Sequence, residues 1–250
     1  MLSESRKLQI LNIVNERNSV TLSELKQIFN ASDSTIRRDI TELDREGKLV
    51  KVFGGAMALG ETNTYDEPNM FQKSTLNIRE KKRIGEFAAT LIKPGDYVYV
   101  DSGTTTGFLC EALKEKDAVY ITNGVAHART MVLKGLKVFL IGGELKETTE
   151  AVVGETAILS LQKYHFSIGF FGTNGISSRA GFTTPDVREG TMKKVAMSCT
   201  DEGRRYILAD HDKFGIISTV TFGDTTSAKV ITDCRPSEKY EKKCEILIAK

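Results

Sequence analysis

Apolar residues recur at helical spacing in two short segments near the start of the chain. The first segment predicts a helix that begins at Leu22, because Thr21 and Glu24 have the spacing of a capping box. Val20 and Leu25 stand at the two positions of a hydrophobic staple around that cap. The apolar face of this helix is predicted to consist of Leu22, Leu25, Ile28 and Phe29.

The second segment follows a short turn at 30–31. Ser32 is suited to cap a helix there, and Gly47 is predicted to end it. The inward face of this helix is predicted to consist of Ile36, Ile40 and Leu43. A strand over 49–53 and a Gly-Gly turn then complete a winged helix-turn-helix domain over residues 1–56.

The second helix would present side chains from its N-terminal end to the base edges and phosphates of DNA. The polar residues expected to contact DNA lie on the outward side of this helix or in the wing: Ser32, Ser34, Thr35, Arg37, Arg38, Thr41, Lys48 and Lys51. Charge does not exclude a small three-helix core with solvated arginines, because basic and acidic residues are nearly equal in number over residues 1–56.

A resemblance to a known family is carried by the same segment. The run TIRRDI at 35–40, together with Arg6, Ile10, Val14 and Ser32, resembles the signature of the DeoR family of bacterial sugar-operon regulators, without a gap in the spacing. The Gly-Gly-Ala run at 54–56 is similar to the wing of that family. The resemblance implies that operator duplex DNA is a partner of this chain.

The pattern changes after residue 56. Residues 57–78 are polar without sustained periodicity and are predicted to be a linker, and residues 79–250 to be an α/β effector-binding domain. Strands are predicted at 97–100, 119–122, 137–141, 166–171, 205–209, 219–222, 230–232 and 245–248. Helices are predicted at 79–92, 105–115, 125–134, 155–163, 186–201 and 237–243. Alternation of apolar strands with helices predicts a mainly parallel sheet that is covered on both faces.

Composition agrees with a two-domain protein of the cytoplasm. The 250 residues are 40% hydrophobic and 27% charged, with a net charge of +2, and no apolar run approaches the length of a membrane span. We therefore expect no membrane partner and no signal peptide. The four cysteines and three histidines show none of the spacings of a metal site or of a nucleophilic triad, so we expect neither metal nor cofactor.

The candidate effector site lies where predicted strands end. The loop Asp101, Ser102, Gly103, Thr104, Thr105 and Thr106 follows a strand and opens a helix. Glycine and hydroxyl residues at a helix N-terminus offer donors to an anion, so phosphate fits this loop, although a simple helix cap would have the same sequence.

Other polar residues are predicted to meet at the same edge of the sheet. Asn123, Gly143 and Asn174 belong to loops that follow strands, and each loop has an alternative interpretation as an ordinary turn. Glu189 and Lys193 are one helical turn apart, which is also the spacing of an ordinary surface ion pair. Lys213 completes the set of candidate effector contacts.

These loops resemble the effector domain of the DeoR family, which is similar to ribose-phosphate isomerase. The resemblance implies that Asp101 and residues 103–106 cradle a phosphate. It also implies that the sugar is lined by Asn123, Glu189, Lys193 and Lys213. The chain departs from the family at Asp212, where Ser often precedes the Lys-Phe pair, and this places a carboxylate beside Lys213.

The function predicted is that of a transcriptional repressor of a sugar-uptake or phosphotransferase operon. A phosphorylated sugar, for example a fructose or tagatose phosphate, would release it from its operator. A homo-oligomer, a dimer or a tetramer, is expected, because helix-turn-helix proteins commonly read paired half-sites. The chain is predicted not to be an enzyme. The alternatives are a sugar-phosphate isomerase with an accessory N-terminal domain and, with less support, an activator or a regulator with an unphosphorylated ligand.

Overall fold

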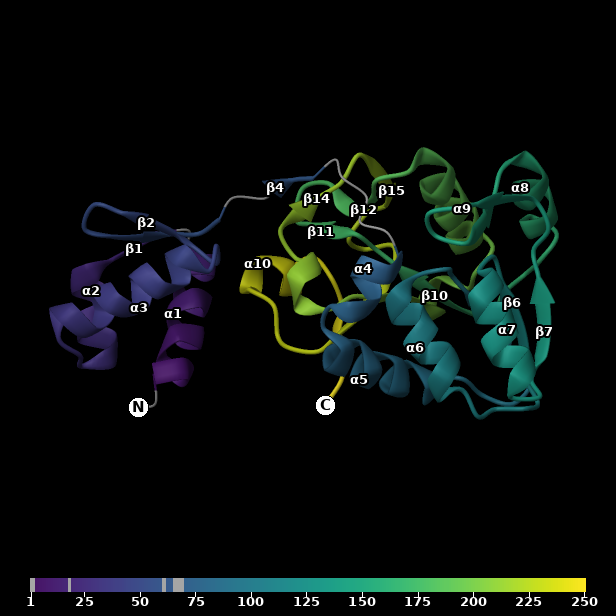
Figure 1. Ribbon diagram of the computed structural model, residues 1–250, viewed down its shortest axis with the longest axis horizontal. Coiled ribbons are helices and arrows are strands. Elements are labelled where there is room, and N and C mark those ends of the chain that lie inside the picture. Colours follow the sequence, from purple (N-terminus) through teal and green to yellow (C-terminus); the bar gives the residue numbers. More distant parts are fainter. Residues whose placement is uncertain (1–2, 18, 60–61, 65–69) are drawn as a thin grey trace. The chain divides into compact units, whose positions relative to one another are not determined.

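The computed structural model describes residues 3–17, 19–59, 62–64 and 70–250. The chain divides into two compact units (Figure 1). The first consists of Met1–Thr62 with Ser237–Lys239, and the second of Asn63–Pro236 with Tyr240–Lys250. The winged helix-turn-helix elements belong to the first unit and the α/β elements to the second.

The first unit is a winged helix-turn-helix. Its helices are α1 (Ser3–Arg17), α2 (Leu22–Phe29) and α3 (Asp33–Arg45). Its strands are β1 (Ser19–Thr21), β2 (Val50–Val52) and β3 (Gly55–Met57), which form an antiparallel sheet in the order β1-β3-β2. The capping box at Thr21 and the cap at Ser32 are both present, so the predicted starts of α2 and α3 are confirmed.

The core of this unit contains the predicted inward residues of both helices, with one exception. Ile36, Ile40 and Leu43 are buried beside Leu25, whereas Ile28 is 46% exposed. The prediction that Ile28 belongs to the apolar face was therefore wrong, because the side of α2 that carries it is not covered by the core of the unit.

One buried charge in this unit has a partner far away in the sequence. Asp39 on α3 is 2% exposed, and its carboxylate accepts hydrogen bonds from the Arg6 guanidinium of α1 at 2.5 and 3.2 Å. The pairing raises the pKa of Arg6 through that hydrogen bond. The two-pronged contact fixes α1 against α3 and so fixes the angle at which α3 is held.

The second unit is built on a seven-stranded parallel sheet in the order β17-β16-β13-β10-β5-β6-β7. Its strands are β5 (Tyr97–Val100), β6 (Val119–Thr122), β7 (Lys137–Leu140), β10 (Ile168–Gly172), β13 (Arg205–Leu208), β16 (Lys229–Thr232) and β17 (Ile246–Ile248). The chain adds strands in one direction from β5 to β7 and in the other from β10 to β17. The strand order therefore reverses between β5 and β10, which is where open α/β sheets bind ligands.

Helices cover both faces of this sheet (Figure 1). Val98 and Val100 of β5 join one core cluster, and Tyr99 between them joins the other. The first cluster includes residues of α5 (Ile78–Ala89), α6 (Thr104–Ala112) and α7 (Val125–Leu133). The second includes residues of α8 (Glu155–Leu161) and α9 (Val187–Ser198). The predicted doubly covered sheet is confirmed.

Several short elements were not predicted, or were assigned to the wrong sheet. β11 (Gly175–Ser177), β12 (Gly181–Thr184) and β15 (Val220–Gly223) form a separate antiparallel sheet, so the predicted strand at 219–222 does not join the parallel one. β8 (Glu144–Lys146) pairs with β9 (Ala151–Val153), and β14 (Ile216–Ile217) pairs with β4 (Thr62–Asn63). The remaining elements are η1 (Glu202–Arg204), η2 (His211–Lys213) and α10 (Glu238–Glu241).

The predicted linker at 57–78 contains regular structure where it is described. It includes α4 (Met70–Thr75), and α5 begins within it at Ile78. The ammonium group of Lys81 donates to the carbonyl oxygens of Lys73 and Leu76, which would otherwise be open at the end of so short a helix. This support comes from the next helix and leaves no periodic signal in the segment itself. Residues 60–61 and 65–69 of the predicted linker lie outside the described residues.

Within the described ranges, no helix combines the length and the apolar character that crossing a membrane requires.

Helices α5 and α6 approach each other at a glycine. A Cβ atom on Gly85 would lie 2.6 Å from the backbone N of Leu109, and Gly203 has nothing within 4 Å of the same position. We expect Gly85→Ala to lower the free energy of unfolding of the second unit by about 2 kcal/mol through forced separation of the helices. Gly203→Ala is the matched control and should stay within about 0.5 kcal/mol of wild type. Equal denaturation midpoints for the two variants would contradict the close packing.

Candidate nucleic-acid interface and effector pocket

The outward side of α3 carries the predicted DNA contacts. The Arg37 and Arg38 side chains are 59% and 81% exposed, and their ion pairs with Asp33 and Glu42 are one-turn pairs on the same helix. Such exposed pairs are weak, so both guanidinium groups can exchange a carboxylate for a phosphate or a base edge at small cost.

Hydroxyl groups are concentrated at the start of α3. Ser32 accepts a hydrogen bond from the N–H of Thr35 at 3.3 Å, and its Oγ lies 2.8 Å from the Thr35 hydroxyl and 3.0 Å from that of Ser34. Ser32 and Ser34 are exposed and Thr35 is half-buried. The helix therefore begins with small donors, which suit close approach to a phosphate.

The wing is fastened to α3 by two hydrogen bonds. The backbone N–H of Lys51 on β2 donates to Asp44 at 2.8 Å, and the Lys51 ammonium donates to the Thr41 hydroxyl at 2.9 Å. Lys48 lies beside Glu46 at 2.9 Å, exposed to solvent. At the tip of the wing Phe53 is fully exposed, whereas the sequence pattern assigned it to the end of a strand.

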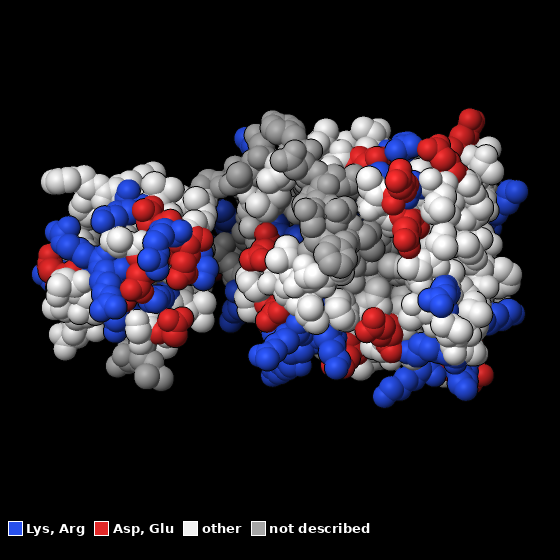
Figure 2. Space-filling view, in the orientation of Figure 1, with Lys and Arg blue, Asp and Glu red and all other residues white. Residues whose placement is uncertain are grey.

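Charges on this unit are mixed rather than uniformly basic. Figure 2 shows Lys and Arg interspersed with Asp and Glu on the face that it presents. Positive charge available to DNA is thus local, as the sequence indicates.

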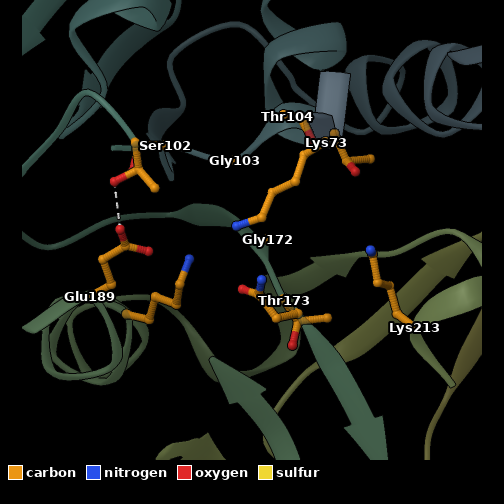
Figure 3. A pocket seen from close by; sticks show the side chains of 12 residues that line it. Lys73, Ser102, Gly103, Thr104, Gly172, Thr173, Glu189 and Lys213 are labelled. Atoms are coloured by element: carbon orange, nitrogen blue, oxygen red, sulfur yellow. Dashed lines mark hydrogen bonds between the residues drawn. The ribbon is translucent and has the colours of Figure 1, made fainter. Parts of the chain in front are cut away.

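A polar pocket opens at the reversal of strand order between β5 and β10 (Figure 3). Loops after both strands, the helix α9 and three outlying segments supply its walls. The lining residues are Lys73, Ser102, Gly103, Thr104, Thr105, Thr149, Gly172, Thr173, Asn174, Glu189, Lys193 and Lys213. The structure therefore brings together eight of the twelve effector residues predicted from the sequence: Ser102, Gly103, Thr104, Thr105, Asn174, Glu189, Lys193 and Lys213.

Asp101 lies beneath the pocket instead of lining it. Its carboxylate is buried, accepts a hydrogen bond from the Gly172 N–H at 2.9 Å, and is paired with the Lys193 ammonium. Asp101 was predicted to help cradle a phosphate, but it is absent from the pocket lining, and its Oδ2 accepts from both the Gly172 amide and the Lys193 ammonium group. Asp101 joins the ends of β5 and β10 and holds Lys193 at the pocket.

Three further predicted residues lie outside the pocket lining. The Thr106 hydroxyl bonds within its own loop and lies 3.1 Å from His127. Asn123 is buried, accepting from the Tyr99 hydroxyl and donating to the Val152 carbonyl. A Cβ on Gly143 would lie 2.8 Å from the Val153 carbonyl oxygen, so this glycine permits close packing. All three residues lie at the predicted edge of the sheet. Their contacts, however, are with the protein interior and not with the pocket.

Glu189 is held as a carboxylate at the pocket wall (Figure 3). It accepts hydrogen bonds from the Thr149 hydroxyl at 2.6 Å and from the Lys146 ammonium at 3.0 Å. Burial would raise the pKa of Glu189, but the charge of Lys193, the Thr149 hydroxyl and Lys146 together lower it. An ionised acceptor fixed in this way is suited to the hydroxyl groups of a sugar.

Another part of the pocket wall is positively charged, because it is formed by two lysines and the N-terminus of α6. Figure 3 shows the side chains of Lys73 and Lys213 entering the pocket from different elements. Thr104 and Thr105 place the start of α6 at the same pocket, where the helix dipole favours an anion. The pocket therefore combines an anion-binding side with a hydrogen-bonding side.

Four lining residues were not predicted from the sequence: Lys73, Thr149, Gly172 and Thr173. Gly172 and Thr173 belong to the loop from which only Asn174 was selected, so adjacency in that loop was a usable signal. Thr149 lies between β8 and β9, two strands that were not predicted. Lys73 lies on α4 in the presumed linker, and nothing in its local sequence indicates a pocket.

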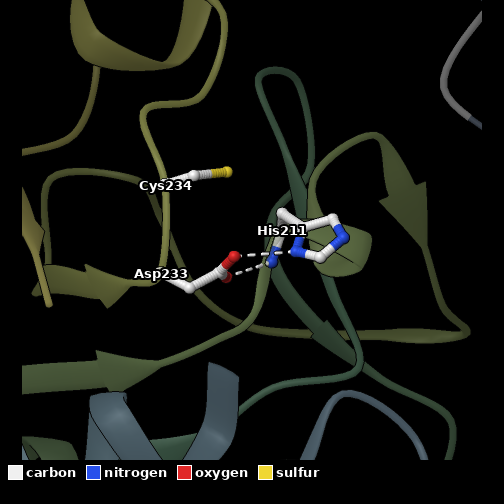
Figure 4. A group of neighbouring side chains, drawn as sticks. All are labelled: His211, Asp233 and Cys234. Carbon is white, nitrogen blue, oxygen red and sulfur yellow. Dashed lines mark hydrogen bonds and ion pairs between the residues drawn. The ribbon is translucent and has the colours of Figure 1, made fainter. Parts of the chain in front are cut away.

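His211, Asp233 and Cys234 form a cluster at the ends of β13 and β16 (Figure 4). His211 Nδ1 lies 2.8 Å from Asp233, which also accepts from the His211 backbone N–H at 2.8 Å. Their ligand atoms and the Cys234 sulfur lie within 4.8 Å of one another, close enough for a metal ion. The Asp233 hydrogen bond raises the pKa of His211 to about 9, and desolvation together with the Asp233 carboxylate raises the pKa of Cys234 to about 11, although Cys234 keeps part of its surface exposed to solvent. Protons on His211 and Cys234 would therefore compete with a metal ion for these two groups. His211 and Asp233 form an ion pair that holds the loop of Lys213 next to the end of β16.

Family models match both parts of the chain. The DeoR-like helix-turn-helix domain matches residues 6–62, and the DeoR C terminal sensor domain matches residues 76–234.

Relatives match over nearly their whole length. The chain is 37% identical over 254 residues to a protein of Bacillus subtilis (strain 168) named "Uncharacterized HTH-type transcriptional regulator FruR", with 100% of both chains covered. It is 34% identical over 245 residues to the lactose phosphotransferase system repressor of Staphylococcus aureus (strain NCTC 8325 / PS 47), with 96% of both covered. Among solved structures, a ribose 5-phosphate isomerase of Methanocaldococcus jannaschii matches 55% of each chain with a TM-score of 0.40 and 15% identity.

The exposed arginines of α3 give a test of the DNA interface. We expect Arg37→Ala and Arg38→Ala each to weaken binding to operator DNA at least fivefold, because each loses a charged contact worth about 1–3 kcal/mol. Arg129→Ala, which removes an exposed arginine from the second unit, is the charge-matched control. Fluorescence anisotropy with labelled DNA from upstream of the gene measures the affinity. Wild-type affinity in both α3 variants would refute the assignment of α3 as the recognition helix.

The His211–Asp233 pair gives a test with a defined pH window. The pKa of His211 is raised in the folded chain to about 9, so its contribution to stability is complete below about pH 6.5 and is lost as pH rises toward 9. We expect the urea midpoint of wild type to fall more steeply over this window than that of His211→Gln. Parallel pH profiles for the two proteins would show that the pair does not stabilise the fold.

Proposed function

The chain belongs to the DeoR family of helix-turn-helix transcriptional regulators, and we propose that it represses a sugar phosphotransferase operon until a phosphorylated sugar fills the pocket. Membership in this family makes the chain a regulator rather than an enzyme, so the isomerase alternative is set aside. Repression of a phosphotransferase operon is supported by the printed name of the S. aureus relative.

The observation that carries the proposal is the two-sided chemistry of the pocket. Lys73, Lys213 and the start of α6 favour a dianion, and Glu189 with Asn174 offers acceptors and donors for hydroxyl groups. A phosphorylated sugar presents these two kinds of group at its two ends. An unphosphorylated sugar would bring no anion to Lys213 and the start of α6, and inorganic phosphate would bring no hydroxyl groups of a sugar to Glu189 and Asn174.

The proposed DNA-bound form contains at least two copies of the chain. In this proposal the start of α3, with Ser32, Arg37 and Arg38, reads one half-site, and Lys51 and Phe53 of the wing lie along the backbone. A single recognition helix covers only a few base pairs, so a two-fold oligomer on paired half-sites supplies the specificity that an operator needs. Dimers and tetramers both satisfy this requirement.

Release requires the sugar phosphate to bind more tightly to the form of the protein that has low affinity for DNA. Because coupling between two sites is reciprocal, operator DNA must then weaken binding of the sugar phosphate by the same factor. Coupling free energies of about 1–3 kcal/mol correspond to changes of roughly 5- to 150-fold. This reciprocity separates true coupling from nonspecific displacement by an anion.

A titration of the operator complex tests the proposal. Fructose 1-phosphate, fructose 6-phosphate and tagatose 6-phosphate are added to full-length protein on labelled upstream DNA, with fructose and inorganic phosphate as controls. We expect one phosphorylated hexose to weaken DNA binding at least fivefold and the two controls to have no effect. Lys213→Ala should require about tenfold more of that hexose phosphate, whereas Lys82→Ala, an exposed lysine of α5, should respond as wild type. Intact DNA binding that no phosphorylated sugar alters would contradict the release mechanism.

A further inference from the structure

Lys73 reaches the pocket from a segment that lies between the two family matches. The helix-turn-helix match ends at residue 62 and the sensor match begins at residue 76, whereas α4 spans Met70–Thr75. Lys73 nevertheless lines the pocket with Lys213 and Thr104 (Figure 3). The first helix of the second unit, which lies outside both family matches, therefore supplies part of the pocket wall.

The end of α4 is held by a buried lysine. Lys81 on α5 is 2% exposed, and its ammonium group donates to the carbonyl oxygens of Lys73 and Leu76, the latter at 2.7 Å. Burial lowers the pKa of Lys81, and the charge of Asp210 partly offsets this effect. Asp210 is fully buried, and its Oδ2 has no hydrogen-bond partner among the described residues. Lys81 thus connects the backbone of Lys73 with charges at the end of β13.

The junction between α4 and α5 is also tied to the loop that carries Lys213. Asn77 has a left-handed backbone conformation, with φ of 51°, and its side-chain amide donates to Asp212 at 2.7 Å. Asp212 directly precedes Lys213, and α4 also packs against α6, which begins at the pocket. The loop of Lys213 is therefore bonded to the start of α5, directly after α4, and α4 itself packs against the helix whose start lies at the pocket.

A six-residue helix is not stable by itself, so the position of α4 depends on these contacts. The charges around Lys81 are mixed, because Asp210 and Asp212 raise its pKa and Lys213 lowers it. A dianion in the pocket would offset the positive charge of Lys213 and add a charge-assisted hydrogen bond to Lys73. Occupancy of the pocket consequently changes the free energy of holding α4 in place.

We infer that Lys73 binds the phosphate of the effector and that α4, through Lys73, transmits pocket occupancy to the chain leading to the DNA-binding unit. The inference rests on the proposed release by a phosphorylated sugar and assigns its coupling element. In this inference α4 has two roles, because it contacts the ligand and is the first helix of the second unit along the chain. An α4 that cannot contact the ligand should leave DNA binding intact and abolish release.

The test compares Lys73→Ala and Lys73→Arg with wild type, and Lys82→Ala serves as a lysine control outside the pocket. Calorimetry gives the affinity of each full-length protein for the hexose phosphate that releases wild type in the titration above. Anisotropy gives the concentration of that compound needed to release upstream DNA. Unchanged DNA affinity in the absence of sugar phosphate shows that each variant is folded.

We expect Lys73→Ala to bind the hexose phosphate about tenfold more weakly and to remain on DNA even when the pocket is saturated. Lys73→Arg, which keeps the positive charge, should recover most of the response, and Lys82→Ala should match wild type. Release of Lys73→Ala at wild-type concentrations would overturn the inference and leave the proposed function standing. Weaker binding with full release at saturation would overturn the transmission by α4. Failure of wild type to respond to any hexose phosphate would instead overturn the proposed function.

Discussion

The Asp101 carboxylate is the contact on which the sensor unit depends. It accepts from the Gly172 amide and pairs with Lys193, so one buried group connects the ends of β5 and β10 with α9. The strand order reverses between β5 and β10, so this ion pair lies where open α/β sheets bind ligands. The charge of Lys193 makes the buried carboxylate tolerable, and Asp101 in turn holds the lysine at the pocket wall. Support of the fold and placement of a pocket residue are thus achieved by the same ion pair.

The DNA-binding unit uses a buried ion pair in a comparable way. Asp39 faces inward from α3 and meets Arg6 of α1, while Arg37 and Arg38 beside it face solvent. Within the run TIRRDI, the buried aspartate orients the helix, and the exposed arginines remain available to a partner. Unpairing a buried charge costs more than the pair contributes, so this arrangement strongly favours one orientation of α3.

Local chemistry explains which features were predictable from the sequence. The caps at Thr21 and Ser32 and the starts of α2 and α3 depend on neighbouring residues, so spacing alone sufficed. The parallel sheet was predictable because its strands are apolar on both faces. The roles of Asp101 and Asn123 were not, since a polar residue after a strand can point into the pocket or into the interior. The position of Lys73 at the pocket depends on hydrogen bonds made by Lys81 and Asn77. These two residues lie outside α4, so the sequence of α4 gives no sign of them.

The hydrogen bonds from Lys51 to Thr41 and Asp44 attach the β2–β3 hairpin to α3, and this affects how the unit would bind operator DNA. Because the hairpin is attached to the reading helix before any duplex arrives, the two cannot adjust independently to the width of the groove. Little conformational entropy remains to be lost on association, and this favours affinity. In the proposed complex with DNA, a duplex that bends or twists to match the separation between α3 and the hairpin would bind best, so sequences that deform easily would be favoured even at base pairs that no side chain touches.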